Sequence, residues 1–341
     1  MAGDLIVITG VSGYIGFKTM HMALAQGYQV RAIVRKQEQI EKLKSHPKVA
    51  PNAAALSFVV IPDMIAEGAF AGVFDGAMAV VHLASPLAKE SDDYERDIVK
   101  PARDLLMAVL EAAINVTTLR RVVVTSSAVS LIPMEWLGTS DTTTVFTEKD
   151  INSNPIRPFN SAMEAYWASK AFARLSTKKF IEERKPHFDI VGLLPSVVLG
   201  PEDLATDNST LLVGTRAMLM PVLQGAELDM PLVGTPVHVD DVARAHVDAI
   251  KPSVPGNADY VLSSDGEEGI EWDSMTDIAR KHFPDEVESG LLALGGSMPT
   301  RKWRLDVSTT EKAFGWKCVP FEKTMRDLIG QYVDFLKKEQ N

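Results

Sequence analysis

The sequence predicts an α/β protein with a doubly wound parallel-sheet core and a smaller, mainly helical C-terminal domain. Three observations predict it. Short apolar runs alternate with helical patterns as far as Pro195, a glycine-rich turn follows the first apolar run, and the pattern changes after Pro195. Alternating strands and helices are typical of parallel sheets whose crossover helices cover both faces.

The elements of the core follow one another in a regular order. Short β-branched runs indicate buried strands, and apolar residues at helical spacing between them indicate helices. We expect strands at 5–9, 28–34, 57–61, 78–83, 121–125 and 188–194. We expect helices at 14–26, 37–44, 93–113 and 161–184, with a kink at Pro101 in the third.

The second half alternates helical stretches with loops rich in Pro, Gly and Asp. The helical stretches cover 211–224, 239–250, 271–282 and 321–337. We therefore predict a cofactor domain at 1–195 and a smaller substrate-binding domain at 196–341, with about 237–262 returning to the core.

The composition excludes several classes of protein. The 341 residues are 46% apolar and 23% charged, as in globular proteins, and the single cysteine, Cys318, excludes an intrachain disulfide. A net charge of −10 disfavours general nucleic-acid binding. We expect no membrane span, no metal site and no secretory signal, and therefore a cytoplasmic protein.

The turn after the first strand is the first candidate site. Gly10, Gly13 and Gly16 follow a strand and open a helix, a context typical of dinucleotide binding. Gly10 permits the tight turn, Gly13 lets the backbone approach a pyrophosphate at the helix N-terminus, and Gly16 allows close helix packing. This predicts a Rossmann core. An ordinary glycine-rich turn is the alternative.

The end of the second strand indicates which dinucleotide is bound. NAD sites commonly place an acid there, whereas this chain has Arg35 and Lys36. An arginine makes the bidentate contacts that a 2′-phosphate prefers, so we predict NADPH/NADP+. A solvated basic strand end is the alternative. Asp63 follows the third strand and either accepts a hydrogen bond from the adenine or caps a turn.

Tyr166 and Lys170 lie one turn apart on a predicted helix, and therefore on one face. A neighbouring ammonium favours the phenolate, so we expect Lys170 to lower the pKa of Tyr166 and suit it to protonate a carbonyl oxygen. Ser126 and Ser127 end the fifth strand, at the sheet edge where such a site belongs. One of the two should face the site, because neighbouring strand residues face opposite ways.

Seven motifs together resemble the extended short-chain dehydrogenase/reductase superfamily, and within it the dihydroflavonol-reductase and cinnamoyl-CoA-reductase branch. The chain is most similar in character to fungal and yeast NADPH-dependent aldehyde and ketone reductases, including the methylglyoxal type. The motifs occur in family order, at 9–16, 30–35, 82–86, 125–128, 166–170, 194–201 and 237–243.

The resemblance implies a catalytic triad of Ser127, Tyr166 and Lys170, with Tyr166 as general acid. It favours Ser127 over Ser126, and it implies that Lys170 also binds the nicotinamide ribose. The motifs and the resemblance together give a set of candidate cofactor-binding residues. These are Thr9, Gly10, Ser12, Gly13, Tyr14, Ile15, Gly16, Arg35, Lys36, Lys42, Asp63, Met64, Leu83, Ala84, Ser85, Tyr166, Lys170, Pro195, Ser196, Val197 and Val198.

The predicted function is reduction of a ketone or aldehyde to an alcohol with NADPH. Flavonoid-reducing relatives carry an Asn where this chain has Ile132, so we expect a hydrophobic carbonyl substrate and a monomer or homodimer. An NAD-dependent nucleotide-sugar epimerase or dehydratase is one alternative, and a non-catalytic dinucleotide sensor is another, because fold alone does not decide function.

Overall fold

The computed structural model describes residues 3–340, which divide into two compact units. The first unit contains the described residues up to Trp136, together with Glu148–Leu194 and Ala243–Tyr260. The second contains Leu137–Thr147, Pro195–Val242 and the described residues from Val261 onward. The assignment of one unit to the cofactor and the other to the substrate stays a prediction.

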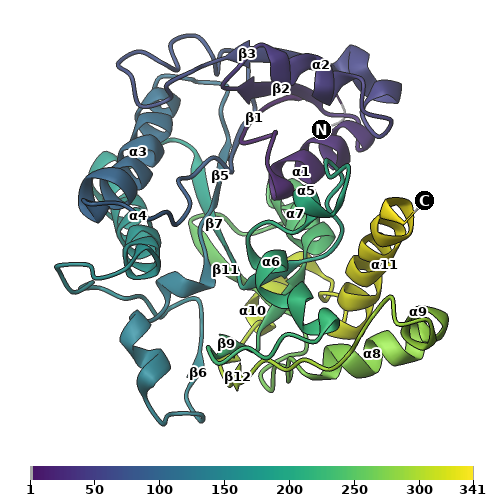
Figure 1. Cartoon of the computed structure of the whole chain (residues 1–341). Helices are drawn as coiled ribbons and strands as arrows, with labels where there is room; N and C mark the ends of the chain where they lie inside the picture. Colours follow the sequence, from purple (N-terminus) through teal and green to yellow (C-terminus); the bar gives the residue numbers. More distant parts are fainter. Residues whose placement is uncertain (1–2, 341) are drawn as a thin grey trace. The chain divides into compact units, whose positions relative to one another are not determined.

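Within the described residues, seven strands form one sheet in the order β11-β7-β5-β4-β1-β2-β3 (Figure 1). The pairs from β3 through β7 are parallel, which confirms the predicted parallel sheet. The strands are β1 (Leu5–Thr9), β2 (Gln29–Val34), β3 (Leu56–Val60), β4 (Ala79–His82), β5 (Arg121–Thr125), β7 (Asp189–Pro195) and β11 (Ala258–Leu262). The chain order reverses between β1 and β4, and ligands of such sheets bind at the carboxyl ends beside that point.

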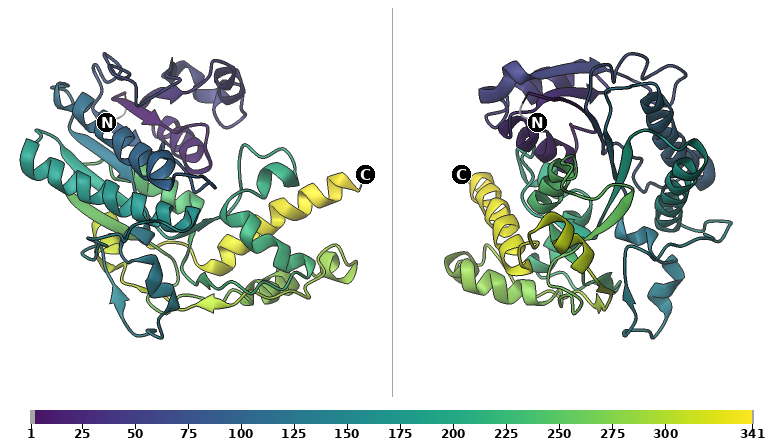
Figure 2. Two further views of the ribbon diagram at one scale, coloured as in Figure 1. Left: turned by 60° about the vertical axis from the view of Figure 1, so that its left-hand side comes forward. Right: turned by 180° about the vertical axis from the view of Figure 1, so that it is seen from behind.

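Helices cover the sheet of the first unit. Helices α3 (Lys100–Ile114) and α4 (Ala162–Arg184) pack side by side on one face, as Figure 2 also shows. The other helices of this unit are α1 (Tyr14–Ala25), α2 (Glu38–Lys44) and most of α7 (Val239–Asp248).

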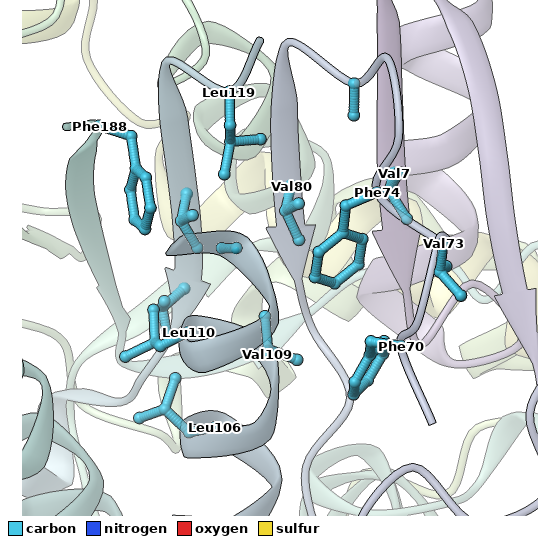
Figure 3. Close-up of a cluster of buried hydrophobic side chains, with 14 of the residues drawn as sticks. Val7, Phe70, Val73, Phe74, Val80, Leu106, Val109, Leu110, Leu119 and Phe188 are labelled. Carbon is cyan, nitrogen blue, oxygen red and sulfur yellow. The ribbon is translucent and has the colours of Figure 1, made fainter. Parts of the chain in front are cut away.

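The main core of the first unit lies between α3 and the sheet (Figure 3). Leu106, Val109 and Leu110 of α3 face Val80 of β4, and Phe74 packs beside them. The apolar positions of α3 recur at helical spacing, so one stripe of the helix is buried while the opposite side stays polar. Burying each such large side chain contributes about 2 kcal/mol of hydrophobic free energy.

The helix predicted at 93–113 differs from the one observed. Glu95–Val99 form a π-helical turn, and the regular helix α3 starts only at Lys100, with Pro101 in its first turn. Proline has no N–H to donate, and the first turn of a helix is where that donor is not needed. The irregularity therefore precedes Pro101, and the predicted kink within one continuous helix is wrong.

The second unit combines helices with short strand pairs, which the helical patterns did not predict. Its helices are α5 (Asn208–Leu211), α6 (Thr215–Leu219), α8 (Ser274–His282), α9 (Pro284–Glu288), α10 (Ser308–Phe314) and α11 (Phe321–Glu339). Its strands pair as β8 (Val197–Leu199) with β10 (Pro236–His238), β9 (Leu232–Val233) with β12 (Thr300–Arg301), and β6 (Val145–Phe146) with β13 (Arg304–Leu305). Among residues 3–340, no helix is both long enough and apolar enough to cross a membrane.

Candidate active site

The glycine turn joins β1 to α1 at the reversal point of the sheet. Gly10 has φ +76°, a conformation that favours glycine, and a Cβ there would lie 2.8 Å from the backbone nitrogen of Ala84. A Cβ at Gly16 would lie 2.0 Å from the carbonyl oxygen of Gly10, so Gly16 lets α1 start directly on the turn. A Cβ at Gly13 would meet only that same oxygen, at 3.4 Å, so the space outside Gly13 is open.

Thr9 ties the end of β1 to the segment after β4. Its hydroxyl oxygen accepts hydrogen bonds from the backbone N–H groups of Leu83 and Ala84, each at 3.1 Å, and pairs with Nδ1 of His82 at 2.9 Å. The predicted cofactor residues 83–85 thus lie against the predicted glycine turn. Of the other residues predicted here, Ser12 lies in the turn, and Tyr14 and Ile15 are the first two residues of α1, whose first turn carries no acidic side chain.

The basic residues predicted to contact a 2′-phosphate are exposed. Arg35 and Lys36 follow β2, and Lys42 lies on α2. Asp63 uses one carboxylate oxygen to accept the N–H of Ile65, at 2.9 Å, so it caps a turn, and the neighbouring Met64 packs against the apolar core. The turn cap is therefore present, while an adenine contact from the exposed carboxylate stays a prediction.

The Ser–Tyr–Lys group is assembled within the first unit. Ser127 follows β5, and its hydroxyl is hydrogen-bonded to the hydroxyl of Tyr166 on α4. Lys170 Nζ lies 5.4 Å from the centre of the Tyr166 ring and donates to the hydroxyl of Ser85 at 2.9 Å. A proton donor, a second hydroxyl and a buried ammonium therefore converge at the carboxyl end of the sheet.

The pKa of Tyr166 differs from the sequence prediction. Burial raises this pKa to about 12, and the hydrogen bond from Ser127 only partly opposes that rise. Lys170 is not a cause of this shift. Its ammonium donates to Ser85, and burial lowers the pKa of Lys170 to about 8. Tyr166 is therefore held in its protonated form, which is the form that a proton donor needs.

A small cavity lies beside Lys170 on the α3–α4 side of the sheet. Its volume is about 30 Å³, enough for one or two water molecules. Ser126 lines it, and the hydroxyl of Ser126 is buried with no partner among the described residues. Ser127 and Ser126 thus have different surroundings: the first contacts Tyr166 and the second faces the cavity.

His82 at the end of β4 gives the site a measurable pH dependence. Burial, and then the nearby Lys170 ammonium, lower the pKa of His82 to about 3. Between pH 3 and 6.5 the unfolded chain binds this proton and the folded chain does not, so stability falls as the pH falls through that window. From pH 6.5 to 4.5 we expect His82 to account for a loss of about 2 kcal/mol in the free energy of unfolding.

Urea denaturation of the wild type and of His82→Asn at both pH values measures that contribution. We expect the loss between the two pH values to be about 2 kcal/mol smaller in the variant. An equal loss in both proteins would show that His82 is not buried in its neutral form.

Arg174, which was not predicted from the sequence, anchors α4 beyond Lys170. The Arg174 guanidinium is buried and donates to Asp259 at 2.8 Å and to the backbone carbonyl groups of Glu148 and Asp150. Tyr166, Lys170 and Arg174 follow one another at intervals of four, so they share a face of α4. The sequence signal for Arg174 was a second long cationic side chain, four residues after Lys170.

Comparison with known proteins decides the family. Residues 6–262 match the model described as the NAD dependent epimerase/dehydratase family. The chain belongs to this family. The match contains the glycine turn, Ser127, Tyr166 and Lys170, and the resemblance to extended short-chain dehydrogenases and reductases is confirmed.

Several members of this family are similar to the chain over most of its length. A ketoreductase of Cercospora nicotianae is 33% identical over 352 residues, covering 100% of this chain and 98% of its own. A dihydroflavonol 4-reductase of Arabidopsis thaliana is 29% identical over 246 residues, covering 72% of this chain and 61% of its own. The crystal structure of yeast methylglyoxal/isovaleraldehyde reductase complexed with NADPH has a TM-score of 0.82 at 24% identity and covers 98% of this chain and 99% of its own, which confirms the fold.

The predicted residues of the second unit belong to β7 and β8. Pro195 ends β7, Ser196 follows, and Val197 and Val198 start β8, which pairs with β10. The hydroxyl of Ser196 is buried with no partner among the described residues. Contacts of these four residues with a cofactor stay a prediction.

Proposed function

We propose that the chain is an NADPH-dependent carbonyl reductase that converts a hydrophobic ketone or aldehyde into an alcohol. The observation that carries the proposal is the hydrogen bond between the hydroxyl groups of Ser127 and Tyr166 beside the buried Lys170. The similarity to ketoreductases over the whole chain supports the same reaction class.

The chain's own residues fit a dinucleotide of this kind. The open space outside Gly13 and the first turn of α1 suit a pyrophosphate, which the helix N-terminus attracts. Arg35 and Lys36 would hold the 2′-phosphate. When bound, NADPH supplies the hydride that is transferred to the carbonyl carbon.

Tyr166 performs the proton chemistry in this proposal. Its hydroxyl donates a proton to the carbonyl oxygen as the C–H bond forms, and the C=O double bond becomes a C–O single bond. Ser127 orients the same oxygen, because its hydroxyl already reaches that of Tyr166. Because the pKa of Tyr166 is raised, its hydroxyl group keeps its proton throughout the neutral pH range.

The proposal is tested by following NADPH oxidation at 340 nm. The panel contains an aryl ketone, a β-keto ester, methylglyoxal, an aromatic aldehyde, a dihydroflavonol and a nucleotide sugar, each repeated with NADH. Turnover of at least one carbonyl compound with NADPH is expected. No turnover of any of them, together with protein that retains tightly bound NAD, would favour a nucleotide-sugar epimerase or dehydratase instead.

Arg35→Ala tests the choice of cofactor. We expect the KM for NADPH to rise about tenfold while kcat and the KM for NADH change little, because a charge-assisted contact to the 2′-phosphate is lost. Steady-state kinetics with both cofactors measure the effect. An equal rise of both KM values would show that Arg35 does not contact that phosphate.

A further inference from the structure

The turn that carries Arg35 and Lys36 is held by a side chain from the next helix. The Oε1 atom of Gln39 accepts the backbone N–H groups of Arg35, at 3.0 Å, and of Lys36, at 3.1 Å. These two N–H groups lie just beyond β2, whose last residue, Val34, still pairs with β3. One amide oxygen thus replaces the partner that the sheet no longer supplies.

Arg35 and Lys36, the two cations of the turn, differ in their ion pairs. Lys36 Nζ lies 3.3 Å from a carboxylate oxygen of Glu38, and both side chains are exposed. The guanidinium of Arg35 is also exposed and is engaged by no ion pair in the part of the chain that the structure describes. Arg35 is therefore available to an incoming anion, whereas Lys36 is partly neutralised by its neighbour.

We propose that Gln39 is a positioning residue for the 2′-phosphate and that Glu38 limits the contribution of Lys36. Gln39 fixes the backbone from which Arg35 extends, so that less conformational freedom is lost when a phosphate binds. Glu38 competes with the phosphate for Lys36. This inference rests on the proposed NADPH site, and it assigns roles to two residues that do not themselves touch the phosphate.

Isothermal titration with 2′,5′-ADP and 5′-ADP tests both roles without any turnover. The variants are Gln39→Met, which keeps the side-chain length but removes the acceptor, and Glu38→Gln, which removes the charge. Gln37→Met is the matched control, because Gln37 is exposed and starts the same helix without a side-chain hydrogen bond to it.

We expect Gln39→Met to raise the Kd for 2′,5′-ADP about fivefold and to leave the Kd for 5′-ADP within about twofold. Glu38→Gln should act in the opposite direction and lower the Kd for 2′,5′-ADP about twofold. Gln37→Met should change neither Kd. If Gln39 and Glu38 had merely structural roles, their substitution would change the Kd values for 2′,5′-ADP and 5′-ADP by the same factor, and neither variant would bind 2′,5′-ADP more tightly.

The outcomes separate the inference from the proposed function. If the wild type binds 2′,5′-ADP more tightly than 5′-ADP but Gln39→Met keeps the same ratio, the role of Gln39 is wrong and the NADPH site stands. If Glu38→Gln binds 2′,5′-ADP no more tightly than the wild type, the role of Glu38 is wrong. If the wild type does not distinguish the two ligands, the NADPH site itself is wrong.

Discussion

Tyr166→Phe is expected to lower kcat for carbonyl reduction about a thousandfold, while the Kd for NADPH changes less than about threefold. The substitution removes one oxygen atom and leaves the ring in place. That oxygen is the proton donor in the proposed reaction, and its hydrogen bond to Ser127 orients it. The loss should therefore appear in the chemical step and leave cofactor binding intact.

Single-turnover kinetics with preformed enzyme–NADPH complex measure that step directly. Tyr94→Phe is the control, because the Tyr94 hydroxyl donates to the exposed Glu90 and lies outside the proposed triad. We expect the control to keep its kcat. If Tyr166→Phe keeps more than about a tenth of the wild-type rate, Tyr166 is not the proton donor.

Arg174→Met is expected to lower the free energy of unfolding by about 3–5 kcal/mol, the largest stability change predicted for this chain. The guanidinium is buried and pairs with Asp259, which is itself largely buried, and it also donates to two backbone carbonyl groups. Methionine fills similar space but leaves both carbonyl groups without their donor and leaves Asp259 only its contact with Lys178.

Lys178→Met provides the matched comparison. Lys178 contacts the same carboxylate of Asp259 at 3.3 Å, but its side chain is 52% exposed. Removing this contact should cost less than about 1 kcal/mol, since exposed ion pairs contribute little. Urea denaturation of the three proteins measures both values. An equal decrease in the free energy of unfolding for both variants would contradict the larger stabilising contribution of Arg174.

The regular part of the fold could be predicted from the sequence because the strands of the main sheet are rich in apolar, mostly β-branched residues, as β1 (LIVIT) and β5 (RVVVT) show. The strands at 5–9 and 121–125 match the structure residue for residue. The two-residue strands of the second unit could not be predicted in this way, because alternation needs at least four residues to be seen. Residues 137–147 join the second unit through β6 and β13, a pairing between segments far apart in the chain.

The positions of the candidate residues in the fold could be predicted from the sequence better than their pKa values. The spacing of Tyr166 and Lys170 placed both on one face of a helix, and the structure has them there. The pKa of Tyr166 was predicted in the wrong direction, because that direction is set by the burial of the phenol and by its hydrogen bond from Ser127. Neither is visible in the spacing. The same holds for Gln39, whose carbonyl oxygen serves backbone groups that no motif records.

The division of the chain into two units also constrains how the protein is made. The chain passes between the units five times, and the last strand of the main sheet, β11, comes after residues 195–242 of the second unit. A nascent chain that has left the ribosome only as far as residue 195 therefore lacks one edge strand of its sheet. The sheet is completed late in synthesis, and truncation after residue 195 would expose the edge of β7, a surface on which other chains can pair.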